Sequence, residues 1–166
     1  MAQAADGIDL DTSLGYLVKQ TAVALRAAME AVLRPLGLTV TQYSCLELLR
    51  QRPGLSGSEL ARGVFVTRQS MHVLLQSLER EGLVTRPDQA PVGRTLPAVL
   101  TGAGRGRLEA ASRAVQQVER SMHDGLDDAQ QVELRRMLRA CSESLQRLPH
   151  RPGARDRPDP PASMTG

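Results

Sequence analysis

The feature that most constrains the fold is a series of helix start and stop signals in the middle of the chain. TVTQ at 39–42 and SGSE at 56–59 both fit a capping box, in which a hydroxyl and a side chain three residues later bind each other's backbone amides. Thr67 can cap a third helix, and Gly63 and Gly82 stand where glycine commonly ends a helix. We therefore expect three short helices, over about 40–52, 57–63 and 68–81.

Longer helices are expected before and after this segment. Apolar side chains recur at helical spacing from Thr12 to Leu36, where Pro35 and Gly37 stop the pattern. On the C-terminal side, Thr101 can cap a helix and the same periodicity continues to residue 147. The sequence thus predicts two further helices, over about 102–122 and 128–147.

Two short strands are expected between the third short helix and the C-terminal helices. LVTR at 83–86 can form the first, residues 87–93 are strong turn formers, and 94–100 can return as the second. Pro97 restricts the second strand to an edge position, because proline cannot donate a ladder hydrogen bond. Three helices followed by a two-stranded hairpin indicate a winged helix-turn-helix domain, predicted over 37–101.

The predicted fold class is mostly α: this winged domain with its two-stranded wing, plus long helices over 12–36 and 102–147. A helix as long as the first one, at the start of a small domain, packs on something outside its own core. Residues 1–11 are small and polar and are expected to be flexible. The five prolines of 148–166 predict a disordered tail.

The charge distribution places a polyanion partner on the winged domain. Residues 56–107 hold seven basic and four acidic side chains, so this segment carries a net charge equal to the +3 of the whole chain. The second helix of a helix-turn-helix enters the major groove of double-stranded DNA. Its outward face here offers donors and acceptors of base-edge size. The DNA-binding candidates at this helix are Thr67, Arg68, Gln69, Ser70, His72 and Gln76.

Further DNA contacts are predicted on either side of that helix. Ser56 and Ser58 stand at the start of the preceding helix, where backbone amides favour a phosphate. Arg94 stands at the tip side of the hairpin, and the tip of a wing lies over the minor groove, whose negative potential attracts arginine. A recognition helix and a wing at this separation together favour DNA binding.

Composition excludes several other classes of protein. Hydrophobic residues make up 41% and charged residues 23%, as in ordinary globular chains, while aromatics at 2% argue against an aromatic platform for bases or sugars. No stretch approaches the roughly 20 apolar residues of a membrane span, and the N-terminus lacks a secretory signal pattern. Two cysteines exclude a disulfide framework. We expect a cytoplasmic protein with no membrane partner.

The sequence offers no pattern of catalytic or metal-binding residues. Its three histidines and two cysteines are scattered, without the CxxC, HxxH or HExxH spacing that a metal site uses. No glycine-rich phosphate loop follows a strand, and no GxSxG elbow is present. We therefore expect no enzyme, no metal and no cofactor.

Four stretches resemble the MarR family of bacterial transcription regulators. They are GLTVTQY at 37–43, RPGLSGSELA at 52–61, VTRQSMHVLLQSLEREGLVTR at 66–86 and GRTLPAVLTGAG at 93–104. The combination of LExxGLV with the run from an arginine to LTxxG is the specific part of the match. In element order the resemblance extends over about residues 12–147.

The resemblance implies a homodimeric DNA-binding regulator, in most members a repressor, that binds a pseudo-palindromic operator. It further implies release by a small aromatic or anionic effector. In this family the first helix and the last two interlock as the dimer. The interface candidates are Leu14, Leu17, Val118, Leu134, Leu138, Cys141 and Leu145. Tyr16 and Tyr43 are the candidates for an effector pocket.

The sequence departs from the family pattern at two DNA-facing positions. The family wing usually carries Asp two residues before its arginine, a position that is Val92 here. Relatives often have a polar or basic residue at the position of Val73. Val73 is therefore expected to remove one DNA contact.

Two alternatives remain open at this point. A regulator of the same fold could respond to oxidants through Cys141 or Cys45, with Cys141 the better candidate because subunits should meet there. A winged helix can also serve protein–protein contact alone. The polar and basic side chains of Arg68, Gln69 and His72 argue against that use.

Overall fold

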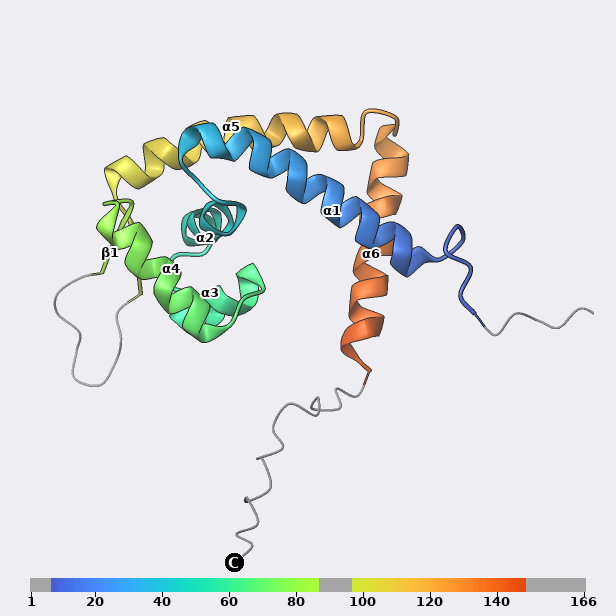
Figure 1. The fold of residues 1–166 in the computed structure, drawn as a ribbon, viewed down its shortest axis with the longest axis horizontal. Helices are drawn as coiled ribbons and strands as arrows, with labels where there is room; N and C mark the ends of the chain where they lie inside the picture. Colours follow the sequence, from blue (N-terminus) through green and yellow to red (C-terminus); the bar gives the residue numbers. More distant parts are fainter. Residues whose placement is uncertain (1–6, 87–96, 149–166) are drawn as a thin grey trace, which may run out of the picture. The chain divides into compact units, whose positions relative to one another are not determined.

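The computed structural model describes residues 7–86 and 97–148. The chain divides into two compact units, Met1–His123 and Asp124–Gly166. The first unit contains α1 Leu14–Leu33, the 3-10 helix η1 Arg34–Leu36, α2 Val40–Gln51, α3 Gly57–Val64, α4 Arg68–Arg80, β1 Val84–Thr85, β2 Val99–Leu100 and α5 Gly102–Met122 (Figure 1). The second contains α6 Asp128–Gln146. This order confirms a mostly helical fold with a two-stranded wing.

The helices begin where the capping signals predict. Thr39 Oγ1 accepts a hydrogen bond of 3.1 Å from the amide of Gln42, and Gln42 Oε1 accepts one of 2.9 Å from the amide of Thr39. Ser56 and Glu59 form the same reciprocal pair at the start of α3. These bonds satisfy amides that the first turn of a helix leaves unpaired. Local sequence therefore determines where α2 and α3 start.

The end of α3 differs from the sequence prediction. The helix continues through Gly63 to Val64, and Phe65 adopts the left-handed conformation, with φ of 61°. Gly63 serves packing instead, since a Cβ there would lie 2.7 Å from Leu48 Cδ1 of α2. The absence of a side chain at Gly63 lets α2 and α3 approach closely.

A single core joins the helix-turn-helix to α1 and α5. Leu46 of α2, Leu60 of α3 and Leu78 of α4 are fully buried, as are Leu33 of α1 and Leu108 of α5. All five belong to one cluster of buried side chains. The C-terminal end of α1 and the N-terminal half of α5 therefore complete the core of the segment that was predicted to bind DNA.

The base of the wing is tied to the start of α5. β1 and β2 pair antiparallel, with Val84 opposite Leu100. Thr101, the N-cap of α5, donates through its hydroxyl to the carbonyl of Gly82 at 2.6 Å. A Cβ at Gly104 would lie 1.9 Å from the backbone oxygen of Leu83, so only glycine fits there. The strand that was expected over 94–100 is described only from residue 97 onward.

Helices α1 and α5 lie side by side (Figure 1). An apolar groove of about 550 Å³ runs between them, lined by small and aliphatic residues such as Ala24, Ala28 and Val118. Within 7–86 and 97–148, every helix is too short or too polar to cross a membrane.

Candidate nucleic-acid interface

The buried stripe of α4 determines which of its side chains face outward. Met71, Leu75 and Leu78 are buried at helical spacing, as predicted. The opposite face is exposed to solvent, and its side chains include polar groups of base-edge size. The exposed members of the predicted set are Arg68, Gln69, Ser70, His72 and Gln76, together with Thr67 just before the helix.

Two of these predicted contacts have a structural role at the start of α4. Thr67 Oγ1 accepts a hydrogen bond of 3.0 Å from the amide of Ser70 and donates one of 2.9 Å to Ser70 Oγ. This pair caps the helix and leaves other amides of the first turn directed outward. Thr67 and Ser70 thus set the N-terminal end from which Arg68 and Gln69 project.

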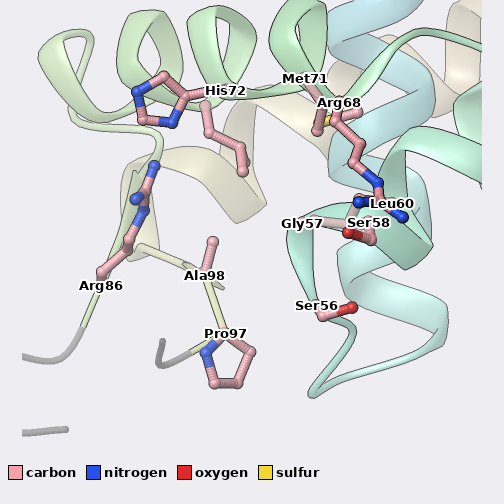
Figure 2. A pocket seen from close by; sticks show the side chains of 11 residues that line it. Ser56, Gly57, Ser58, Leu60, Arg68, Met71, His72, Arg86, Pro97 and Ala98 are labelled. Atoms are coloured by element: carbon pink, nitrogen blue, oxygen red, sulfur yellow. The ribbon is translucent and has the colours of Figure 1, made fainter. Parts of the chain in front are cut away.

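The start of α3 and the side of α4 enclose one hollow with the base of the wing. It measures about 310 Å³ and has an apolar floor formed by Leu60, Leu75 and Ala98. Figure 2 shows Arg68 extending from α4 towards Ser58 at the start of α3. The hollow therefore brings together candidates that the sequence places on separate elements: Ser56, Ser58, Arg68 and His72.

Arg86 is a basic residue of this hollow that the sequence analysis missed. It follows β1 and its guanidinium is directed towards His72 in Figure 2. Arg86 Nε bonds Glu79 Oε1 at 2.8 Å, while Nη2 is buried with no hydrogen-bond partner among the described residues. Its only signal in the sequence was a basic residue at the end of the first wing strand. Arg86 adds a second arginine to the hollow beside Arg68.

The wing prediction at Arg94 and the departure at Val92 lie outside the described residues.

The two tyrosines that were predicted for an effector pocket lie in different surroundings. Tyr16 is exposed in the first turn of α1. Tyr43 is half-buried on α2, where burial raises the pKa of its hydroxyl despite a hydrogen bond with Ser112 of α5. Ser112 also donates to Glu47 Oε2 at 3.2 Å. Tyr43 therefore lies at the contact between α2 and α5.

The predicted interface residues are mostly exposed. Leu14 and Leu17 are exposed on α1, and Val118 on α5 is half-buried along the apolar groove. In the second unit, described by itself, Leu134 of α6 is half-buried, and the rest of its predicted stripe is exposed. Those exposed members of α6 are Leu138, Cys141 and Leu145.

The two cysteines differ in accessibility. Cys45 is fully buried, its thiol lies 3.9 Å from Met71 Sδ, and burial raises its pKa to about 12. Because the thiolate is the reactive form, such a thiol is inert to mild oxidants. Cys141 is exposed. In the parts of the chain that are described, His, Cys, Asp and Glu side chains form no group suited to a metal ion.

Comparison with known proteins agrees with this geometry. A family model described as "MarR family" matches residues 36–95. The HTH-type transcriptional repressor Rv2887 of Mycobacterium tuberculosis is 42% identical over 132 residues, which cover 80% of this chain and 95% of the relative.

Solved structures of the same relative are similar as well. Rv2887 in complex with salicylic acid is 42% identical and has a TM-score of 0.65, covering 79% of this chain and 97% of that one. Rv2887 in complex with DNA is 40% identical and has a TM-score of 0.66, covering 79% and 98%. The family model matches, and the 42% identity extends over nearly the whole relative. The chain therefore belongs to the MarR family of winged helix-turn-helix transcription regulators.

Proposed function

We propose that this chain is a transcriptional repressor whose homodimer binds pseudo-palindromic operator DNA and is released by a small aromatic or anionic effector. The observation that carries the proposal is the polar outward face of α4 with the exposed Arg68 at its start, beside the hollow at the start of α3. A DNA-facing helix needs this combination of base-sized polar groups and positive charge.

In the proposed complex α4 enters the major groove from its N-terminal end. Arg68 and Gln69 project from its first turn and contact base edges, arginine pairing with guanine and glutamine with adenine. Ser56 and Ser58 line the same hollow as Arg68, and in the proposed complex the start of α3 contacts a phosphate. Arg94 holds the wing in the minor groove.

The homodimer is supported by apolar surface that one chain leaves uncovered. The groove between α1 and α5 is lined mainly by small and aliphatic side chains, and α6 exposes Leu138 and Leu145. Exposed apolar surface of this kind, present on each of the two units, favours an interface between copies of the chain. A two-fold dimer presents two copies of α4 to half-sites about one helical turn apart.

An aromatic or anionic effector is supported by the relative that binds salicylic acid, which is both aromatic and anionic. In this chain α2 and α5 meet through Tyr43, Glu47 and Ser112. A ligand that shifts α5 would therefore act directly on α2.

The test is a titration of the purified protein with its own upstream intergenic DNA and with a scrambled duplex, at several salt concentrations. We expect the native duplex to bind about 10³-fold more tightly or better. Addition of salicylate should weaken that binding. Absence of binding to either duplex at low salt would overturn the proposal in favour of a protein-interaction module.

A further inference from the structure

Val73 is an apolar residue on the outward face of α4, where the sequence places it. Its side chain is 55% exposed, on the outward face that also carries Gln69, His72 and Gln76. Gln69 precedes it by four residues and Gln76 follows it by three, so both are its neighbours on the helix surface. Val73 belongs to neither the buried core nor the half-buried residues packed against it.

Packing of the core does not require a valine at this position. A β-branched residue loses side-chain freedom in a helix and forms helices less readily than alanine, glutamine or arginine. The lost freedom is recovered when the side chain packs, as Leu74 and Leu75 do on the same helix. Val73 is absent from the core and from the residues packed against it, so a partner that covers its side chain would recover this freedom.

We propose that Val73 contacts the 5-methyl group of a thymine in the major groove and so selects an A·T pair in each half-site. Thymine is the only base that presents a methyl group there. The inference rests on the proposed function, because it needs α4 to lie in the groove. It replaces the expectation that valine merely removes a DNA contact.

Valine selects an A·T pair because it offers an apolar contact and because it has no hydrogen-bonding group. Contact between two apolar groups removes both from water, which is favourable. Cytosine would present its amino group and guanine its carbonyl oxygen to a side chain that can neither donate nor accept a hydrogen bond. Those base groups would lose water without gaining a partner, which disfavours a G·C pair.

Gln69 on the preceding turn is consistent with the same base pair or its neighbour. A glutamine amide can bond adenine through both its carbonyl and its amino group. Arg68 and His72 lie towards the hollow beside α3, whereas Val73 does not line that hollow. The outward face of α4 therefore divides into a basic side and a side suited to A·T pairs.

The experiment begins with selection of tight-binding duplexes from a random pool by the wild-type protein. Each thymine of the selected half-site is then replaced in turn by deoxyuridine, which lacks only the methyl group. Affinities are measured for the wild type, for Val73→Ala and for Gln76→Ala. Alanine favours a helix, so the first variant retains the fold.

We expect one deoxyuridine position per half-site to weaken wild-type binding about fourfold, the effect of one buried methyl-sized group. Val73→Ala should show no loss at that position, while Gln76→Ala, altered on the same face, should keep it. Val73→Arg should change the preferred base there to guanine.

Equal deoxyuridine losses in the wild type and in Val73→Ala would overturn the inference and leave the proposed function intact. Selection that enriches no sequence over the starting pool would overturn both.

Discussion

Gln42 at the start of α2 donates a hydrogen bond of 3.1 Å from Nε2 to Glu81 Oε1 at the end of α4. Ser77 donates to the same oxygen at 3.0 Å. Gln42 is only 8% exposed, and its carbonyl oxygen is already engaged by the amide of Thr39. One buried side chain therefore connects the first turn of α2 to the C-terminal end of α4, the helix proposed to face DNA.

Replacing Gln42 with Ala should lower the free energy of unfolding by about 1–3 kcal/mol, since the amide of Thr39 and the carboxylate of Glu81 both lose a partner. Urea unfolding measures the change. Ser77→Ala is the control, because it removes a donor from Glu81 but leaves the capping box at Thr39 intact, and its effect should be smaller. Equal effects of the two substitutions would contradict the role given to Gln42.

Two glycines of α5 should respond in opposite directions to alanine. Gly104→Ala places a Cβ against the backbone oxygen of Leu83, and overpacking of this kind costs about 1–3 kcal/mol or more. Gly106 has open space around it, so Gly106→Ala should stabilise by up to about 1 kcal/mol through helix propensity. Thermal unfolding of the pair provides the comparison. A stabilised Gly104→Ala would show that α5 does not pack closely against the backbone of Leu83.

Arg68→Ala should weaken specific DNA binding by about 1–3 kcal/mol and relax the preference at one base pair per half-site. Arg80 is the matched control. It is an exposed arginine at the other end of α4, where its Nε bonds the carbonyl of Gln76. Arg80→Ala should change affinity little in the same titration. If the two variants lose affinity alike, Arg68 acts only through its charge.

Arg94→Ala should weaken binding across all sequences and lower the slope of log affinity against log salt by about one phosphate contact. The measurement is a salt titration with native and scrambled duplexes. A loss of preference at one base position, with the salt slope unchanged, would assign Arg94 to base reading instead.

Glu47 makes the stability of the fold depend on pH at acid values. Burial raises the pKa of this carboxyl, but hydrogen bonds from Arg50, Gln51 and Ser112 together lower it below its ordinary value. The stabilisation of the folded state by ionised Glu47 is thus fully present above the unfolded-state pKa, near 4.5. It is lost as the pH falls through the lower pKa of the folded state.

Glu47→Gln should therefore be less stable than the wild type at neutral pH, and the difference should shrink as the pH falls below about 4. Urea unfolding at a series of pH values measures it. Ser112→Ala, which removes one of the three donors, should show part of the same effect. A difference that is constant from pH 7 to pH 3 would exclude Glu47 as the group responsible.

The sequence predicts those features of the fold that depend on neighbouring residues. Thr39, Ser56 and Thr67 each cap a helix, because a hydroxyl and an amide three residues away interact in any helix start. The prediction that Gly63 ends α3 was wrong because the role of this residue depends on a distant part of the chain. Its role is set by Leu48, which lies on another helix, and no local signal distinguishes a packing glycine from a terminating one.

The candidate site shows the same division. The outward face of α4 follows from the spacing of its buried stripe, so Arg68 and His72 could be identified from periodicity. Arg86 could not, because its position in the hollow depends on how β1 meets α4 and on its ion pair with Glu79. Contacts between elements are not encoded in the residues next to Arg86.

The core shared by α1, α5 and the helix-turn-helix limits how a signal can act on this protein. Leu33 and Leu108 are fully buried in one cluster with Leu46, Leu60 and Leu78, and close-packed interiors have low compressibility. We therefore expect the segment proposed to face DNA to move together with α1 and α5, which share its core. In the proposed dimer, a signal then changes the separation between the two copies of α4. Both copies can bind DNA only when that separation matches the helical repeat of about 34 Å.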